Sequence, residues 1–339
     1  MKRYLWLKAK LLASMLKSGK LTPKKVANMM SAYLSYIFRS NTSSQSPSIV
    51  FFELSNRCNL HCVACRESPA KIYDQNPRGG GCDVPIGDLP AEIYRAVIDD
   101  VGDRLMMAVL YVNGEPLLRS DLFELIRYAT QKKVATMIST NGMLLTEERV
   151  SKLLECGVDF IKIAVSGFTQ EVYGLNHRGG DVEVVKTNLE TLSRLHRARR
   201  SSTIIMLDYI VFEHNIHETS HWQRFSDQLG FIFNLRTGIS QGQTSVKEIA
   251  AGLSPAVNLC DWLWKIATIN WDGTVFPCCE FATWKGIKGL GTVSKRMESL
   301  SGVWNGAPYQ SFRKAHRIKG RSAIPRCVNC HYKGIRLQG

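Results

Sequence analysis

Three cysteines are crowded into one short segment, Cys58-Asn-Leu-His-Cys62-Val-Ala-Cys65, directly after an apolar run that predicts a β-strand. Three thiolates on one tight loop can ligate three irons of a cubane cluster and leave the fourth iron free to bind a small molecule. The alternatives are a zinc knuckle that recruits His61 as its fourth ligand, or incidental buried cysteines. The motifs that come later in the chain favour the iron–sulfur cluster.

Apolar runs typical of strands alternate with helical patterns from residue 49 to about residue 243. The predicted strands are 49–54, 106–112, 135–139, 160–165, 204–211 and 231–236, and the predicted helices include 90–100, 120–132, 147–155 and 182–197. Such alternation indicates a parallel sheet with helical crossovers. Six units are too few for a closed eight-stranded barrel, so we expect an α/β fold with an open partial (β/α)6 barrel. Ligands in such folds bind at the carboxyl ends of the strands.

Composition divides the chain into three predicted regions. Residues 1–47 form a basic amphipathic helical extension with a polar linker, residues 48–245 form the partial barrel, and residues 246–339 form a small cysteine-rich domain. The second helix of the extension is predicted to begin at Thr22-Pro23, an N-cap followed by proline at the first helical position. In the third region a hairpin is expected around Trp271-Asp272-Gly273.

Short motifs after the predicted strands resemble those of the radical S-adenosylmethionine (SAM) superfamily. Besides the cysteine triplet they are Asn113-Gly114-Glu115-Pro116, Ser139-Thr140-Asn141-Gly142, Ser166-Gly167 and the arginine of a His-Arg-Gly-Gly run, Arg178. The resemblance implies a [4Fe-4S] cluster on Cys58, Cys62 and Cys65, whose open iron is chelated by SAM. It also implies that SAM is cleaved to a 5′-deoxyadenosyl radical, which abstracts hydrogen from a substrate.

The same resemblance implies SAM contacts for eight residues. Asn113, Gly114, Glu115 and Pro116 would bind the SAM amino group, Ser139 and Asn141 belong to the segment at the end of the third strand, Ser166 would lie near the ribose, and Arg178 would reach the SAM carboxylate. A bidentate contact between an arginine and a carboxylate is physically sensible. Ala64 departs from the family pattern, which usually has an aromatic residue just before the third cysteine.

Five cysteines follow residue 259, and four of them resemble the SPASM extension of radical SAM enzymes in its shortened form, the twitch subdomain. They are Cys260, Cys278, Cys327 and Cys330. The resemblance implies a second [4Fe-4S] cluster, closed by four thiolates, that transfers electrons or supports structure rather than binding substrate. Aminocyclitol dehydrogenases of butirosin biosynthesis have similar cysteine spacing. A four-cysteine zinc ribbon is the alternative.

Three cysteines remain outside both sets. Cys279 stands beside a predicted ligand, and Cys82 follows a glycine-rich stretch, Arg78-Gly79-Gly80-Gly81. Either thiol is a candidate hydrogen-atom donor to a substrate radical. The simpler interpretation of Cys279 is a small buried hydrophobic residue or an alternative ligand. Cys156 lies on a predicted helix and is expected in the core.

The formal net charge is +15, and residues 1–47 hold nine lysines and arginines without a single acid. Basic faces with aromatic residues suit a membrane surface or an anionic partner, so we expect peripheral membrane contact through residues 1–40. A helical hairpin packed on the barrel is the alternative. No apolar run approaches the ~20 residues needed to cross a bilayer, and no cleavable signal peptide is evident. We therefore expect a cytoplasmic protein, which is why the cysteines indicate metal sites rather than disulfides.

The expected reaction is oxidation (dehydrogenation) of a small molecule such as a sugar, an aminocyclitol or a nucleotide-linked substrate, with an anionic group favoured by the charge balance. The resemblance implies an electron donor such as flavodoxin or ferredoxin. The alternatives are a radical epimerase, a C–C bond-forming enzyme on a carbohydrate or nucleoside, and a peptide-modifying SPASM enzyme. The helical extension is too short for a peptide-binding winged-helix domain, which favours a small molecule. A non-enzymatic zinc or iron–sulfur scaffold that binds nucleic acid leaves the SAM-like motifs unexplained, so no nucleic acid is expected.

Overall fold

The computed structural model describes residues 2–65, 86–238, 259–282, 288–294 and 298–328. One curved sheet runs through both the barrel and the cysteine-rich region, with strand order β6-β5-β4-β3-β2-β1-β7-β8-β9. The strands are β1 (Ile49–Phe52), β2 (Met107–Val109), β3 (Ala135–Thr140), β4 (Phe160–Val165), β5 (Ile204–Val211), β6 (Ile232–Thr237), β7 (Ile266–Ile269), β8 (Thr274–Phe276) and β9 (Gly291–Thr292). The first six strands are parallel, which confirms the predicted open partial barrel.

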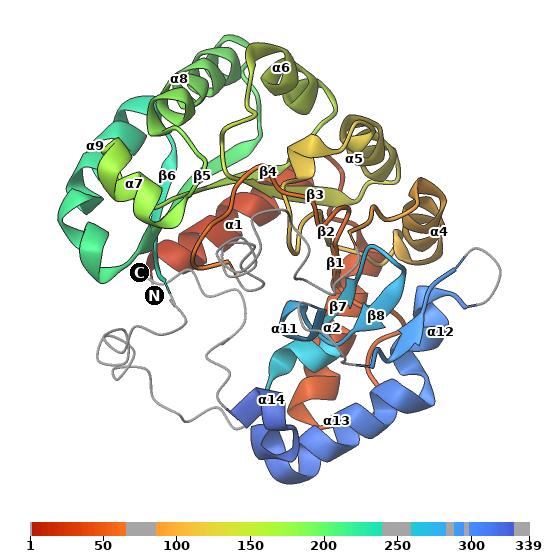
Figure 1. Cartoon of the computed structure of the whole chain (residues 1–339). Coiled ribbons are helices and arrows are strands. Elements are labelled where there is room, and N and C mark those ends of the chain that lie inside the picture. The colour runs from red at the N-terminus through yellow and green to blue at the C-terminus, as the bar shows by residue number, and fades with distance from the viewer. Residues whose placement is uncertain (1, 66–85, 239–258, 283–287, 295–297, 329–339) are drawn as a thin grey trace.

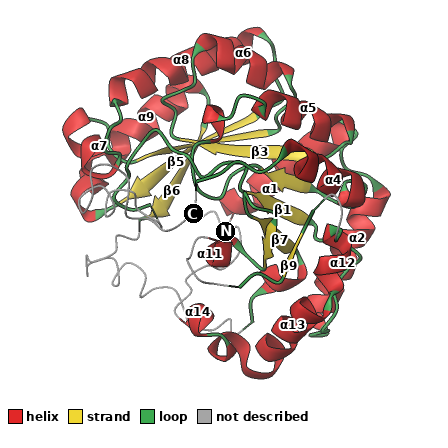
Figure 2. Ribbon diagram, turned by 45° about the vertical axis from the view of Figure 1, so that its right-hand side comes forward, coloured by secondary structure: helices red, strands yellow, loops and turns green. Residues whose placement is uncertain are grey.

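Helices cover the convex face of this sheet, as Figures 1 and 2 show. They are α4 (Ala91–Val101), α5 (Leu122–Gln131), α6 (Glu147–Glu155), α8 (Val182–Ala198) and α9 (Thr219–Leu229), with the short α7 (Gln170–Asn176) before α8. Each turns an apolar stripe inward. In α4 the buried residues Tyr94, Val97, Ile98 and Val101 follow helical spacing. Most of the helices lie close to their predicted positions, whereas α7 and α9 were not predicted.

The cysteine-rich region continues the sheet. Strand β7 pairs in parallel with β1, in a register that places Ile49 opposite Ile266. Strands β7 and β8 then form the antiparallel hairpin predicted around Gly273, whose φ of +84° suits a turn glycine. The α-helices among the described residues of this region are α11 (Cys279–Ala282), α12 (Leu300–Asn305), α13 (Ala307–Lys319) and α14 (Pro325–Val328).

Alternation along the strands separates two faces of the sheet. In β1 the residues Val50 and Phe52 join the large core beneath the outer helices, whereas Phe51 between them belongs to a second cluster with Met107 and Val109. This second cluster lies on the concave face. Since side chains alternate across a strand, charged residues at the concave positions face the interior of the partial barrel.

Helix α1 (Lys2–Lys17) lies on the concave side of the sheet (Figure 2). Its buried residues Leu7 and Met15 and the partly buried Leu11 between them join clusters that contain Phe160 and Met107. The helix therefore fills the amino-terminal end of the partial barrel with apolar side chains. Helix α2 (Pro23–Ile37) begins where predicted, since Thr22 caps it by accepting a hydrogen bond from the Lys25 amide.

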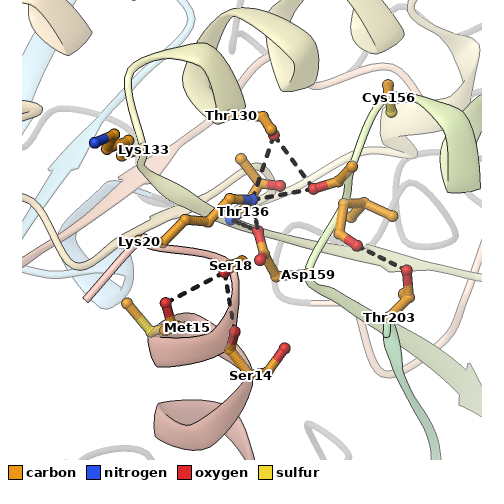
Figure 3. Close-up of polar contacts among 12 residues, drawn as sticks. Ser14, Met15, Ser18, Lys20, Thr130, Lys133, Thr136, Cys156, Asp159 and Thr203 are labelled. Atoms are coloured by element: carbon orange, nitrogen blue, oxygen red, sulfur yellow. Dashed lines mark hydrogen bonds and ion pairs between the residues drawn. The ribbon is translucent and has the colours of Figure 1, made fainter. Parts of the chain in front are cut away.

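A buried ion pair fixes the turn between α1 and α2 to the barrel (Figure 3). The Nζ atom of Lys20 lies 2.7 Å from Oδ2 of Asp159, and both side chains are 6% exposed. Lys20 also donates to the Gly157 carbonyl, while Asp159 accepts from the Thr136 amide. Removal of one partner from a buried pair is costly because it leaves an uncompensated charge. The amino-terminal extension is thus an integral part of the fold.

Lys25 of α2 also attaches the extension to the barrel, because its Nζ atom donates to the Lys133 carbonyl. Burial and the nearby Lys20 charge lower the pKa of Lys25 to about 8 from its ordinary value of 10.5. The folded chain therefore releases this proton at a lower pH than the unfolded chain does, so stability should rise as pH increases from about 8 to about 10.5. The melting temperature of the wild type minus that of Lys25→Met should therefore increase over this interval.

The matched control for this measurement is Lys24→Met, which removes the exposed neighbouring lysine that pairs with Asp103. A surface pair contributes little, so the pH dependence of this variant should follow the wild type. A constant difference in melting temperature between Lys25→Met and wild type across the interval would contradict the assignment.

Among the described helices, none has the length and apolar character needed to cross a bilayer.

Candidate functional site

The cysteine triplet lies on the loop that follows β1, at the carboxyl end of the parallel strands. Gly114, in the segment that follows β2, packs directly against the backbone of this loop. A Cβ atom on Gly114 would lie 2.5 Å from the Ser55 carbonyl oxygen and 2.6 Å from that of Arg57, and its φ is +73°. The Glu115 amide donates to the Arg57 carbonyl at 2.7 Å. Only glycine lets the two segments approach this closely.

The thiols of the triplet are close enough to influence one another. Burial raises the pKa of the Cys58 thiol to about 11, and Glu115 and Cys65 add to the shift. For Cys62 the pKa is raised further, by burial first and then by Cys65 and Cys58. Three neighbouring thiolates in a partly desolvated loop need positive charge beside them. An iron cluster supplies that charge, so the donor set fits such a group.

A second segment holds the triplet loop from the other side. The His61 amide donates to the Arg178 carbonyl at 3.0 Å, and the Val63 amide donates to the Asn176 carbonyl at 2.9 Å. The Asn176 side chain accepts from the Ala64 amide at 3.1 Å through Oδ1. The segment that ends α7 therefore meets the cysteine loop at three successive points.

Ser166 and His177 form a hydrogen-bonded chain with the Asn176 side chain. The Nδ2 atom of Asn176 donates to Ser166 Oγ at 3.1 Å, and Ser166 Oγ lies 2.6 Å from Nδ1 of His177. The His177 ring stacks on Tyr173 with centroids 4.6 Å apart. Burial, aided by Arg236, lowers the pKa of His177 to about 3, so the ring is neutral. Ser166 is fully buried, and its hydroxyl contacts both Asn176 and His177.

Glu115 connects the ends of β2 and β3. Its side chain is buried, with Oε1 accepting from the Leu117 amide at 3.1 Å and Oε2 accepting from the Asn141 amide at 2.8 Å. Burial raises its pKa to about 7. Asn141 in turn donates to Asn59, which lies between the first two cysteines of the triplet. Pro116 is buried at the start of a 3-10 turn, Pro116–Leu118. The predicted motifs are therefore brought together around the loop.

The remaining predicted SAM contacts lie at the same end of the sheet. Ser139 is half-buried at a concave position of β3, and Arg178 has an exposed side chain while its carbonyl binds the loop. Asn113 donates to Oε1 of Glu53 at 2.7 Å. The Trp271 amide, in the β7–β8 turn, lies 3.5 Å from Oε2 of Glu53. Burial raises the pKa of Glu53 to about 7.

An ionic network on the concave face was not predicted. Lys162 of β4 donates to the Tyr111 hydroxyl at 2.7 Å, and its Nζ lies 3.9 Å from Oδ2 of Asp208 on β5. Two residues of β6 complete the set, with Arg236 donating to Asp208 Oδ2 at 2.9 Å and Asn234 donating to Oδ1 at 2.7 Å. Burial alone would raise the pKa of Asp208, but Arg236 and Lys162 hold it below its ordinary value.

The carboxy-terminal cysteines that the structure describes pack in or against two apolar clusters. Cys260 and Cys278 pack against the concave-face cluster, and Cys278 and Cys327 pack against a smaller cluster built on Phe276. Cys279 is buried in the concave-face cluster, which matches the simpler interpretation of this residue, while its role as a hydrogen-atom donor stays a prediction. Cys156 is buried in the main core as predicted. Cys82 and Cys330 lie outside the described residues.

Comparison with known proteins identifies the family. A model of the radical SAM superfamily matches residues 52–222, which is about half of the chain. The chain belongs to the radical SAM superfamily. A SPASM model, described as an iron–sulfur cluster-binding domain, matches residues 260–331. These matches imply SAM and a [4Fe-4S] cluster in the partial barrel, and further iron–sulfur binding in the SPASM region.

Two curated relatives are similar in sequence to this radical SAM protein over part of its length. It is 29% identical over 191 residues to an AdoMet-dependent heme synthase of Methanosarcina barkeri, which covers 56% of this chain and 50% of that protein. It is 28% identical over 224 residues to the mycofactocin maturase MftC of Mycobacterium ulcerans, which covers 64% and 55%. The chain therefore spans about half the length of these relatives.

The fold of the radical SAM protein also matches a solved structure. Streptococcus suis SuiB bound to its precursor peptide SuiA superposes with a TM-score of 0.60 at 12% identity, over 80% of this chain and 67% of that chain. At this identity the likeness concerns the fold. It agrees with the mostly parallel sheet and with the SPASM region that extends it.

Asn176 and His177 were missed as functional residues, although the neighbouring Arg178 was noted. We expect Asn176→Ala to lose the cluster on the Cys58–Cys65 loop several-fold faster than wild type under a chelator. The Ala64 amide would lose its acceptor, and a buried donor left unpaired costs about 1–3 kcal/mol. Bleaching of the visible iron–sulfur absorbance measures the rate.

Asn176→Asp is the matched control because its carboxylate still accepts from the Ala64 amide while the donor to Ser166 is lost. Because the buried carboxylate also loses the bond to Ser166, we expect its bleaching rate to lie between those of the wild type and Asn176→Ala. Equal rates for Asn176→Ala and wild type would show that the hydrogen bond does not hold the loop.

Proposed function

We propose that this radical SAM enzyme oxidises a small anionic molecule by two electrons, with the substrate held on the concave face of the partial barrel. The observation that carries the proposal is the network of Lys162, Asp208 and Arg236 inside the barrel. It places the two cations Lys162 and Arg236 around the single carboxylate of Asp208, so one positive charge is left over. The network lies on the concave side of the sheet, inside the partial barrel. A carboxylate or phosphate group on the substrate would balance the additional positive charge.

Cys58, Cys62 and Cys65 would hold the open cluster, and Cys260, Cys278, Cys327 and Cys330 would hold the closed one. When bound, the open cluster and SAM supply a radical that removes a hydrogen atom from the substrate. Around SAM we place the motif of Asn113, Gly114, Glu115 and Pro116 together with Ser139, Asn141, Ser166 and Arg178. Glu115 and Ser166 act as positioning residues, because their polar atoms already bind the surrounding chain.

Glu53 is our candidate for the proton acceptor. A dehydrogenation removes a hydrogen atom, a proton and an electron, so the chain must supply a base. Glu53 lies between Asn113 of the barrel and the β7–β8 turn of the SPASM region. Its pKa, raised by burial to about 7, suits a group that takes a proton near neutral pH. The closed cluster on Cys260, Cys278, Cys327 and Cys330 would supply the acceptor for the electron.

The test is an anaerobic reaction with SAM, dithionite and an anion-exchange fraction of a cell extract in heavy water. One anion should give a product two mass units lighter with no solvent deuterium at the reacting carbon. Lys162→Met should lose this conversion, whereas SAM cleavage in the absence of substrate should persist. A mass-neutral product carrying one deuterium would instead establish an epimerase, with Cys279 or Cys82 as candidate donors.

Modification of a peptide is the second candidate function, and the similarity to a mycofactocin maturase favours it. The same chemistry would then act on a side chain that reaches the concave face. A peptide fraction tested beside the anion-exchange fraction distinguishes the two. Conversion in the peptide fraction alone would replace our proposal of a small molecule.

A further inference from the structure

Helix α2 packs with its polar side inward. Three of its residues are buried, and two of these are Lys25 and Asn28. Lys25 donates to the Lys133 carbonyl, and Asn28 donates to the Ser46 carbonyl at 3.0 Å. The third buried residue is Ala32, and Met29 packs partly buried against the concave-face cluster. An ordinary surface helix exposes its polar side, whereas α2 buries two of its long polar side chains.

The outward side of α2 is correspondingly apolar. Its large apolar residues recur at helical spacing and are between 38% and 77% exposed, namely Val26, Met30, Tyr33, Leu34, Ile37 and, just after the helix, Phe38. On α1 the residues Trp6, Leu12 and Leu16 are also exposed. We call these nine residues the outer apolar face. These nine residues are more than half of the large apolar residues that are exposed in the described part of the chain.

Basic residues accompany the outer apolar face. No acid precedes Glu53 in the chain, and Lys8, Lys10, Lys17 and Arg39 are exposed on or beside α1 and α2. The only acids that these helices meet through lysine ion pairs in the described structure are Asp159 and Asp103, contributed by the barrel. The face thus combines apolar and cationic groups without acidic ones of its own.

The face is also held in a fixed orientation. Leu7 and Met15 of α1 pack into the concave side of the sheet, and the Lys20–Asp159 pair fixes the turn between the helices. Figure 3 shows this turn at the start of β3 and β4, near Thr136 and Asp159. It lies at the amino ends of the strands, whereas the cysteine loop lies at their carboxyl ends.

We propose that α1 and α2 form a docking face for an anionic lipid bilayer. A helix that lies in a membrane interface presents apolar and aromatic residues to the acyl chains and lysines to the headgroups, as this face does. A second copy of the chain fits less well, because it would bring its own exposed Lys8, Lys10, Lys17 and Arg39 against the same charges. The proposal is independent of the reaction that the enzyme catalyses.

The experiment measures co-sedimentation of the cluster-loaded enzyme with two kinds of vesicle, phosphatidylcholine alone and an equal mixture with phosphatidylglycerol. The wild type should bind the mixed vesicles, and binding should weaken as salt is added. The triple variant Met30→Ser, Ile37→Ser, Phe38→Ser should lower the partition coefficient more than about tenfold. The charge variant Lys10→Glu, Lys17→Glu should weaken binding to the mixed vesicles only.

A matched control changes three exposed apolar residues elsewhere, Val184→Ser, Ile216→Ser and Ile318→Ser. This variant should bind vesicles like the wild type, and all variants should keep their iron and their SAM cleavage. Failure of the wild type to bind mixed vesicles at low salt would overturn the proposal, as would equal binding to phosphatidylcholine alone. A dimer in solution that the first triple variant abolishes would assign the face to a second copy instead.

Discussion

Replacing Cys58, Cys62 and Cys65 together by alanine should leave a protein with about four irons per chain, instead of about eight, that cleaves no SAM. The triplet loop is held by Gly114 and Asn176 independently of its own thiols, so the variant should still fold. We attribute the remaining irons to the carboxy-terminal cysteines, in the region that matches the SPASM model. Iron and sulfide analysis after anaerobic reconstitution, with chromatography for 5′-deoxyadenosine, measures both outcomes.

Cys156→Ala is the matched control, because Cys156 is buried in the main core far from both cysteine sets in sequence. It should keep about eight irons and full SAM cleavage. Tightly bound zinc without iron–sulfur absorbance in the wild type would contradict the assignment of both sites. Retention of all the iron in the triple variant would show that other residues ligate the first cluster.

Gly114→Ala should lower SAM cleavage more than about a hundredfold, although it adds a single methyl group. The new Cβ would approach the Ser55 and Arg57 carbonyl oxygens to within 2.6 Å, and both belong to backbone that cannot rotate away. Its φ of +73° adds a further penalty of about 1–2 kcal/mol for a residue with a Cβ. The loop must therefore shift, and each 1.36 kcal/mol of lost transition-state stabilisation slows the reaction about tenfold. Single-turnover formation of 5′-deoxyadenosine is the measurement.

Gly179→Ala separates close approach from backbone strain. Its φ of +82° is similar and it also adjoins the cysteine loop, but the nearest atom to its Cβ would be Cδ2 of His61 at 3.9 Å, an ordinary contact. We expect this variant to lose much less activity than Gly114→Ala. Equal losses in the two variants would mean that strain at the glycine, rather than contact with the loop, limits the reaction.

Much of the barrel could be predicted from the sequence because its signals are local. Apolar runs bounded by turn residues located strands β1 to β6 of the barrel, and Thr22-Pro23 located the start of α2. The cysteine triplet and the Asn113–Pro116 motif likewise carry their chemistry within a few residues. The parallel register then brings such motifs to one end of the sheet without further information.

The rest depends on partners far apart in sequence. Asn176 and Ala64 are separated by 112 residues, and nothing near Asn176 indicates that its side chain accepts from the cysteine loop. Asp208 lies in an otherwise apolar strand, and its role follows only when Arg236 is placed on the neighbouring strand. The amphipathic pattern of α2 was recognised, but not that its polar side would be the buried one.

The pairing of β1 with β7 has a consequence for how the chain is made. On the ribosome the amino-terminal half emerges first, yet Ile49–Phe52 has its second neighbour only when Ile266–Ile269 has been synthesised. Until then one edge of this phenylalanine-rich strand stays unpaired and can join other strands. Pairing between such distant segments is slow to form. Completion of the SPASM region is therefore a step in the folding of the catalytic barrel itself, and chains that stop before it should be prone to aggregation and should depend on chaperones.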